Sequence, residues 1–266
     1  MPILKRSAAE QMLQETSGPD FLEALARGLR VLEAFNQDRK QLTLSEVAKL
    51  VDLPRASVRR TLHTLVQLGY ADMNDRLFRL TPRVLALARA YLQSNAVTDI
   101  VQPALERLSE EIGESCSAAV LDGEDVMMIA HASPQRIIPV SAQIGFRLPA
   151  VATSLGRVLL AALDDRRLDE FLARVHPKKV TKFAVVDKSV LRKAILKVRD
   201  QGYALVDQEA EIGFRSIALP LRKLDGRIIA ALNVGVHSEH APLKAMHNRF
   251  FPKLRVLADE LQQLLI

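Results

Sequence analysis

The sequence has one cysteine among its 266 residues, no tryptophan, three tyrosines and nine phenylalanines. A single cysteine, Cys116, cannot close an internal disulfide bond, which argues against a small disulfide-stapled secreted domain. No apolar run reaches the roughly 18 residues that a membrane-spanning helix needs. No charged-then-apolar leader of a signal peptide is present either. We therefore expect a cytoplasmic protein without a membrane partner.

Sequence motifs of catalysis and of cofactor binding are also missing. The sequence contains no G-x-S-x-G, no phosphate-binding P-loop and no G-x-G-x-x-G. His237 and His240 are three residues apart, but neither a cysteine nor a carboxylate stands at a metal-binding interval from them. We expect no cofactor and no metal, and we predict that the protein is not an enzyme. An enzyme acting on a small acid, fused to a DNA-binding domain, remains a weaker reading.

Positive charge is concentrated in one part of the chain. The length suggests two domains of ordinary size, and an apolar content of 48% suffices for packed cores. Seven arginines and two aspartates lie between Arg55 and Arg89, a net charge of +5 against +6 for the whole chain. A basic patch of this kind is what binding to DNA phosphates requires.

Residues 43–69 predict two short helices joined by a tight turn. Thr43 is suited to cap the first helix, and Pro54 is tolerated at the start of the second, where its missing N–H costs nothing. The second helix shows the apolar spacing of one helical face, with Val58, Leu62, Leu65 and Val66. This arrangement is a helix-turn-helix, whose second helix enters the major groove of DNA.

The outer face of the second helix is basic, and a hairpin is predicted directly after it. Residues 70–80 read as two short strands around a turn, with Arg76 at the tip of this wing. Arginine can pair with guanine in the major groove, whereas Arg60 could equally hold a phosphate. The alternative is an ordinary solvated helix face. The predicted DNA-binding residues are Thr43, Arg55, Ser57, Arg59, Arg60, His63 and Arg76.

Three further elements are expected around the helix-turn-helix. Residues 42–44 should form a one-turn strand that pairs with the wing. A helix starting at Thr81 and Pro82 could pair with its copy in a second subunit, or pack on its own domain. An amphipathic helix over 21–35 should pack behind the helix-turn-helix through an inward face made of Leu22, Leu25, Leu29, Leu32 and Phe35.

The second half of the chain switches to the period-two pattern of strands. Strands are expected over 115–121, 126–131, 137–144, 203–206, 216–221 and 228–236, with a loop over 145–149. Helices are expected over 100–112, 153–163, 165–175, 189–201 with Ser189 as cap, and 243–266 with a bend at Pro252. The predicted class is α+β with a mostly antiparallel sheet. The predicted domains are a disordered tail (1–19), a winged helix-turn-helix (20–81), a linker helix (82–97) and an effector-binding domain (98–266).

One stretch of this second half suggests a ligand site. Residues 152–157 begin a helix directly after a loop, and free N–H groups at a helix start bind anions. Plain helix capping explains the same residues equally well. Asn233 interrupts an apolar strand, so its buried side chain needs a partner, either a ligand or a neighbouring loop. His131 at a strand end and Cys116 inside a strand are expected to be ordinary structural residues.

Four segments resemble the IclR family of bacterial transcription regulators: ARGLRVLEAF, LSEVAKLVDLPRASVRRTLHTLVQLGY, LPAVATSLGRVLLAAL and GYALVDQEAEIGFRSIALPL. The resemblance extends from about residue 21 to residue 266. It implies a winged helix-turn-helix joined by a linker helix to an effector domain of GAF-like α/β fold. It also implies homodimers, in some members homotetramers, on palindromic double-stranded DNA operators.

The segments RIIPVSAQIGFRLPAVATSLGRVLLA and RSIALPLRKLDGRIIAALNVGVH are similar to one branch of that family. This branch regulates aromatic-acid breakdown through the β-ketoadipate pathway, with members responding to protocatechuate, 4-hydroxybenzoate or β-ketoadipate. The resemblance implies a small aromatic or dicarboxylic acid effector whose carboxylate meets the N–H groups of Ser154 and Leu155. The other implied effector contacts are Ile137, Val140, Leu148, Thr153, Asp207, Ser216, Asn233 and Gly235. The alternatives are a regulator for another small organic acid and a ligand-independent repressor.

Overall fold

The computed structural model describes residues 18, 20–36, 38–94, 96–134 and 144–265. The chain divides into two compact units between Ser94 and Asn95. The predicted tail, residues 1–19, lies almost wholly outside the described residues. No helix in the described part of the chain is long and apolar enough to cross a membrane.

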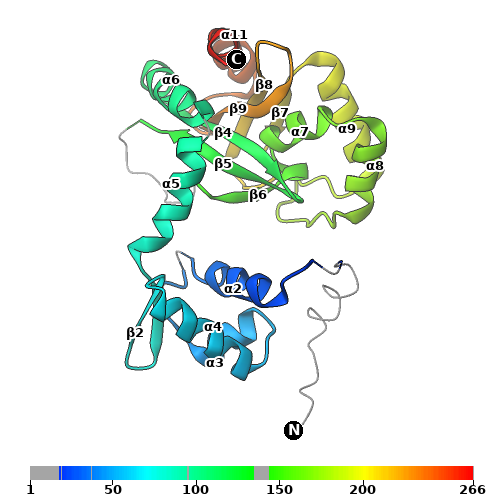
Figure 1. The fold of residues 1–266 in the computed structure, drawn as a ribbon. Coiled ribbons are helices and arrows are strands. Elements are labelled where there is room, and N and C mark those ends of the chain that lie inside the picture. Colours follow the sequence, from blue (N-terminus) through cyan, green and yellow to red (C-terminus); the bar gives the residue numbers. More distant parts are fainter. Residues whose placement is uncertain (1–17, 19, 37, 95, 135–143, 266) are drawn as a thin grey trace. The chain divides into compact units, whose positions relative to one another are not determined.

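The first unit is a winged helix-turn-helix (Figure 1). Its antiparallel sheet has the order β1-β3-β2, so the one-turn strand before the helix-turn-helix pairs with the wing as predicted. Its elements are α2 (Glu23–Glu33), β1 (Leu42–Thr43), α3 (Leu44–Leu50), α4 (Arg55–Gln67), β2 (Ala71–Asn74), β3 (Leu77–Leu80), the 3-10 turn η1 (Pro82–Val84) and α5 (Leu85–Ser94).

The two helices of the helix-turn-helix begin where the sequence predicts. The Thr43 hydroxyl accepts the Glu46 N–H at 3.3 Å, and the Glu46 carboxylate accepts the Thr43 N–H at 2.7 Å, which completes a capping box. Pro54 immediately precedes α4. Val58, Leu62 and Leu65 of α4 are buried in the core of this unit.

The predicted inward face of α2 is wrong for three of its five residues. Leu22, Leu25 and Leu29 are 69%, 61% and 48% exposed, whereas Phe35 is buried and Leu32 packs against the core. The helix has two apolar faces, and the one containing Val31 faces the core. Apolar periodicity identifies an apolar face but not the surface that covers it, which is the reason for the error.

The helix after the wing begins as a 3-10 turn and continues as α5. Thr81 caps it, as predicted, by accepting the Arg83 N–H at 3.3 Å. Leu87 and Tyr91, which belong to its predicted apolar face, are exposed in this single chain.

The second unit contains a six-stranded antiparallel sheet of order β6-β5-β4-β9-β8-β7. Its strands are β4 (Ser115–Asp122), β5 (Asp125–Ala132), β6 (Arg147–Pro149), β7 (Ala204–Asp207), β8 (Phe214–Arg222) and β9 (Ile228–His237). Its helical elements are α6 (Ala96–Ile112), the 3-10 turn η2 (Ala150–Ala152), α7 (Ser154–Ala161), α8 (Asp165–Arg174), α9 (Lys188–Gln201), α10 (Leu243–Ala245), the π-helical turn η3 (Met246–Phe250) and α11 (Phe251–Leu264).

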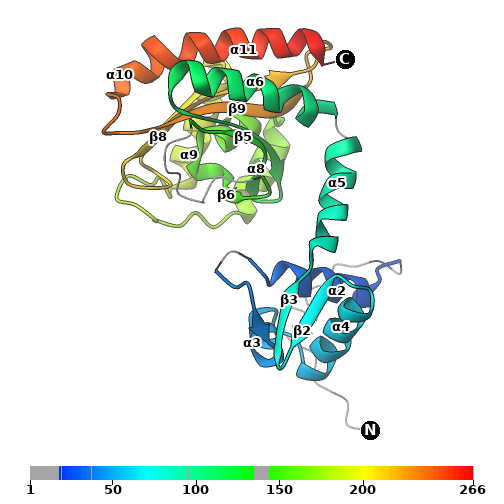
Figure 2. The same cartoon turned by 90° about the vertical axis from the view of Figure 1, so that its left-hand side faces the viewer.

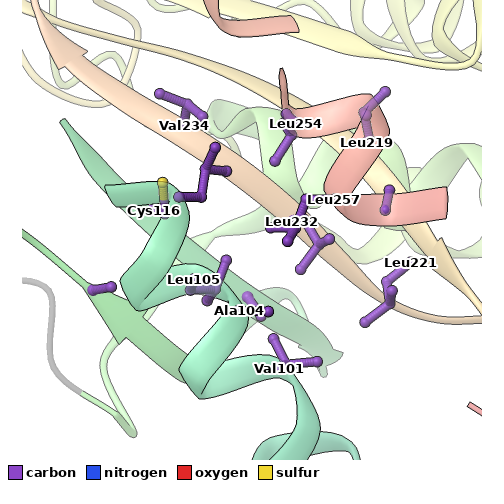
Figure 3. Close-up of a cluster of buried hydrophobic side chains, with 14 of the residues drawn as sticks. Val101, Ala104, Leu105, Cys116, Leu219, Leu221, Leu232, Val234, Leu254 and Leu257 are labelled. Atoms are coloured by element: carbon purple, nitrogen blue, oxygen red, sulfur yellow. The ribbon is translucent and has the colours of Figure 1, made fainter. Parts of the chain in front are cut away.

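Helices cover both faces of this sheet (Figures 1 and 2). On one face, α6 and α11 bury a cluster that includes Leu105, Leu232 and Leu254 (Figure 3). On the other face, α7, α8 and α9 bury a second cluster around small sheet residues such as Ala119 and Ala231. The predicted α+β class with an antiparallel sheet is confirmed.

Four element predictions need correction. Helix α9 is capped by the Asp187 carboxylate, which accepts the N–H groups of Ser189 and Val190, so Ser189 is not the cap. Helix α6 begins at Ala96 and carries Pro103 inside it. The predicted loop 145–149 contains strand β6, while most of the predicted strand 137–144 lies outside the described residues. Pro252 falls in the first turn of α11, after the π-helical turn, where proline is tolerated.

Candidate functional site

The exposed face of α4 carries the basic residues that the sequence singled out. Arg55, Arg59 and His63 follow one another at intervals of four and are all exposed, so they form one line along the helix. Arg60 is exposed beside this line. Ser57 is half-buried, and its hydroxyl accepts a long hydrogen bond of 3.4 Å from Arg27 of α2.

The wing places Arg76 at its exposed tip, next to Asp75, whose φ of +56° makes the turn. Farther along the wing, Arg79 pairs with Asp72 at 2.8 Å, and that hydrogen bond lowers the pKa of the Asp72 carboxyl. Thr43 differs from the other candidates, because its hydroxyl is engaged in the capping box with Glu46. The structure thus brings the basic candidates to the helix face and the wing, and gives Thr43 a structural role.

The second unit contains a cavity of about 220 Å³. It is bounded by the sheet, by the start of α7 and by the loop over residues 208–213. Apolar walls come from Met128, Phe146, Leu148, Leu155 and Phe214. Its volume suits a small ligand.

At one end of this cavity lies the start of α7. The Thr153 hydroxyl accepts the Gly156 N–H at 3.0 Å, and the Thr153 carbonyl accepts the Arg157 N–H at 3.0 Å. Within the part of the chain that is described, the structure gives no partner for the N–H groups of Ser154 and Leu155. Such groups at a helix N-terminus attract an anion.

The start of α7 is held firmly against its surroundings. The buried hydroxyl groups of Ser154 and Ser216 of β8 are 2.7 Å apart. A Cβ atom at Gly156 would collide with the backbone of Ala150, so only glycine allows this close approach. The first turn of α7 is therefore fixed both to the sheet and to the preceding turn.

Strand register brings polar residues from four strands to the floor of the cavity. Ser115 of β4, Gly235 of β9 and Ser216 of β8 form one row across the sheet. His131 of β5, Ser117 of β4 and Asn233 of β9 form the next row. All six line the cavity.

The second row contains two polar atoms without a partner. The Ser117 hydroxyl lies 3.0 Å from His131 Nδ1, but His131 Nε2 is buried and has no hydrogen bond among the described residues. Asn233 is 7% exposed, and its Oδ1 is in the same situation. Because buried polar groups are normally paired, two such atoms in one row indicate a missing ligand.

Gly235 has a steric role in the same floor. A Cβ atom there would collide with the ring of Phe214, which lies over Gly235 and lines the cavity. The absence of a side chain at residue 235 therefore leaves room for an aromatic wall.

Two ion pairs lie beside the cavity. Arg157 of α7 and Glu209 are joined at 2.7 Å with both side chains buried, and Glu209 also accepts the Val185 N–H at 3.2 Å. Asp207, a predicted effector contact, pairs with Arg215 at 3.0 Å and does not line the cavity. Alternation along β7 explains this placement, because Val206 faces the cavity and its neighbour faces away.

The predicted effector residues are therefore placed as follows. Leu148, Thr153, Leu155, Ser216, Asn233 and Gly235 line the cavity. Ser154 lies directly behind the lining, through its contact with Ser216. Ile137 and Val140 lie outside the described residues. Sequence reasoning missed Ser115, Ser117 and Phe214, although the serines alternate with Cys116 in a way that marks one strand face.

Metal and thiol chemistry find no support in the described part of the chain. It contains no group of three or more histidine, cysteine or acidic residues placed to hold a metal ion. Burial raises the pKa of the Cys116 thiol to about 12, so this cysteine is an unreactive core residue.

Comparison with known proteins agrees with both halves of this architecture. The family model of the IclR helix-turn-helix domain matches residues 24–74, and that of the C-terminal domain of bacterial IclR transcriptional regulators matches residues 89–263. The chain belongs to the IclR family. This bacterial transcriptional regulator therefore has a DNA-binding helix-turn-helix domain followed by the family's C-terminal domain.

Similar proteins within the family share a theme. The Pca regulon regulatory protein of Pseudomonas putida is 41% identical over 261 residues, covering 98% of this chain and 90% of its own. The p-hydroxybenzoate hydroxylase transcriptional activator of Acinetobacter baylyi is 34% identical, covering 94% of each chain. The crystal structure of an IclR homologue from Microbacterium hydrocarbonoxydans, complexed with 4-hydroxybenzoate, is 27% identical with a TM-score of 0.76, covering 91% of this chain and 98% of its own.

Proposed function

We propose that this regulator senses a small aromatic acid in the cavity of its second unit and controls genes of aromatic-acid breakdown. The observation that carries the proposal is the cavity itself, with two unpartnered N–H groups of α7 at one end and the unpartnered amide of Asn233 in its floor. The relatives named above for the Pca regulon and for p-hydroxybenzoate hydroxylase support the pathway. The relative that holds 4-hydroxybenzoate supports the effector class.

In this proposal the effector's carboxylate accepts hydrogen bonds from the N–H groups of Ser154 and Leu155. The helix dipole of α7 stabilises the negative charge there. The ring packs between Leu148 and Phe214, both of which line the cavity. Binding alters operator affinity only as far as the acid prefers one arrangement of the DNA-binding units over another. A coupling of about 1–3 kcal/mol, or 5–150-fold, is ordinary for such systems.

The DNA is contacted by α4 and the wing. We assign guanine recognition to Arg55 and Arg59, which lie on one exposed line of α4. Arg60, His63 and Arg76 are assigned to the sugar–phosphate backbone or minor groove, with Ser57 as a short polar contact. Thr43 contributes by fixing the start of α3.

We further propose that the protein acts as a homodimer, which can associate into a tetramer, on a palindromic operator. The support is the exposed apolar stripe on α2, formed by Leu22, Leu25 and Leu29. Exposed apolar side chains gathered on one helix face are typical of a surface that another chain covers. Two copies related by a two-fold axis would present two α4 helices to two half-sites.

The test combines operator selection with effector titration. Full-length protein is used to select binding sites from random duplex DNA, and affinity for the selected site is measured by fluorescence anisotropy. The titrations use 4-hydroxybenzoate, protocatechuate and benzoate, and a reporter gene behind the same site records transcription. We expect at least one acid to change affinity or transcription 5-fold or more. If no acid binds or changes either readout, the proposal is wrong.

A further inference from the structure

The side of the cavity away from α7 is built around His131, which no part of the proposed function has used. The Gln102 side chain of α6 holds the backbone of this residue at both polar groups. Gln102 Oε1 accepts the His131 N–H at 3.0 Å, and Gln102 Nε2 donates to the His131 carbonyl at 2.9 Å. The ring is fixed in turn by the contact between Nδ1 and the Ser117 hydroxyl. His131 is therefore oriented by two other side chains.

His131 is neutral at physiological pH, because burial lowers the pKa of its imidazole. A neutral imidazole has one N–H donor and one acceptor nitrogen, and Ser117 occupies only Nδ1. Nε2 is left as an unpaired buried atom, and Asn233 Oδ1 two strands away is left in the same way. The pair offers hydrogen bonds without offering charge.

The charged residues around this pair are acidic. Among the described lining residues, the carboxylates are Glu114, Glu209 and Glu211, and no lysine or arginine is present. Glu209 is neutralised by Arg157. Glu114 lies 3.6 Å from His240 across the outer edge of the strand. A second carboxylate on the effector would therefore meet carboxylates and lack a cation, which makes its burial costly.

The spacing of the two polar ends fits one aromatic ring between them. The start of α7 is fixed to β8 through Ser154 and Ser216, and His131 lies on β5, three strands away in the sheet order. Three strand spacings are roughly 14 Å between backbones, and the side chains at both ends extend inward from that separation.

We propose that His131 and Asn233 recognise an uncharged hydroxyl group of the effector, which is therefore a hydroxylated monocarboxylic acid and not a dicarboxylic acid. This inference rests on the proposed function, because it takes the carboxylate to lie at the start of α7. A hydroxyl group can donate to Asn233 Oδ1 and accept from His131 Nε2, so it satisfies both unpaired atoms at once. Sites built to bind a hydroxyl discriminate strongly against analogues that lack one, because their own polar groups then stay unpaired.

The test is calorimetric titration of the full-length protein with benzoate, 3-hydroxybenzoate, 4-hydroxybenzoate and terephthalate. In the wild type, the better hydroxybenzoate should bind at least about tenfold more tightly than benzoate. Terephthalate should bind more weakly than either monocarboxylate. In His131→Phe and in Asn233→Leu, the ratio of hydroxybenzoate to benzoate affinity should fall to within about twofold of one.

The matched control is His247→Phe, which changes a histidine that stacks on Phe251 and does not line the cavity. This variant should keep the wild-type ratio. Ser117→Ala serves as a second, milder variant that releases the His131 ring and should reduce the ratio part of the way. Melting temperatures without acid identify any variant that fails to fold.

Three outcomes would overturn the inference. A ratio that survives in both cavity variants would place the hydroxyl elsewhere. Terephthalate binding as tightly as a hydroxybenzoate would remove the charge argument. If the wild type binds benzoate and hydroxybenzoate equally, this inference fails while the proposed function stands. If it binds none of the four acids, the proposed function fails and the inference fails with it.

Discussion

The hydroxyl groups of Ser154 and Ser216 meet at 2.7 Å, 62 residues apart in the sequence and buried between helix α7 and strand β8. This contact joins the first turn of α7 to the sheet at the point where the cavity begins. It makes the position of the free N–H groups of α7 a property of the packed domain. A bound carboxylate would therefore meet donors that are already in place, at little cost in ordering.

Gly156→Ala should disrupt the start of α7, because the added Cβ atom would collide with the backbone of Ala150. Overpacking of this kind costs about 1–3 kcal/mol. We expect a lower free energy of unfolding in urea and a loss of effector binding. Gly28→Ala is the control, because a Cβ atom there has no neighbour within 4 Å. Equal stability of the two variants would contradict the packing seen around Gly156.

Glu209→Gln should destabilise the protein, because it leaves the Arg157 guanidinium buried without its counter-charge. Breaking a buried ion pair from one side typically costs about 3–5 kcal/mol. The double variant Arg157→Met with Glu209→Gln should recover part of that loss, since no charge then stays buried. Urea unfolding of the two single variants and the double variant measures this. A double variant less stable than either single variant would speak against the charge as the cause.

The His131 pKa predicts a pH dependence of stability. Its folded-state pKa is lowered by burial, so the unfolded chain binds a proton at higher pH than the folded chain does. The resulting stability is present above the ordinary histidine pKa of about 6.5 and is lost as pH falls below it. We expect wild-type stability to fall more steeply between pH 7 and pH 5 than that of His131→Gln. Parallel pH profiles would show that His131 titrates normally in the folded state.

Arg59→Ala should weaken operator binding by about 1–3 kcal/mol if the side chain reads a guanine. Anisotropy on the selected operator and on unrelated duplex DNA distinguishes the two roles. Unequal loss indicates base reading, whereas equal loss indicates a phosphate contact. Lys197→Ala is the control, since Lys197 is exposed on α9 of the other unit. Operator binding unchanged by Arg59→Ala would remove this residue from the DNA face.

Leu25→Glu should dissociate the proposed dimer, because it places a charge in the middle of the exposed stripe on α2. Sedimentation velocity should show a monomer where the wild type is larger, and operator affinity should fall with it. Leu224→Glu is the control, an equally exposed leucine in a turn of the second unit. A wild-type oligomer that survives Leu25→Glu would assign dimerisation to another surface.

Local physics explains why much of the first unit could be predicted from sequence. The capping box of Thr43 and Glu46, the proline before α4 and the spacing of Val58, Leu62 and Leu65 all act within a few residues. The same holds for the antiparallel class of the second unit, since strand periodicity and turn residues are local too. The error on α2 arose because the sequence shows two apolar faces, and only packing shows that Val31 faces inward.

The cavity could be predicted only in part. The start of α7 and Asn233 were visible as a loop-to-helix junction and as a polar residue within an apolar strand. His131 could not be assigned, because its role depends on Ser117 and Gln102, which lie 14 and 29 residues away. Asp207 shows the same limit, since a shift of one residue along a strand moves a side chain to the opposite face.

The sequence by itself therefore determined a basic winged helix-turn-helix, an antiparallel effector domain and a helix start suited to an anion. These follow from interactions over a few residues, where propensity, capping and periodicity dominate. Only the tertiary structure decided which polar side chains share one floor and which of them lack a partner. That decision depends on strand register and on helix packing, which join residues far apart in the chain and leave no local pattern in it.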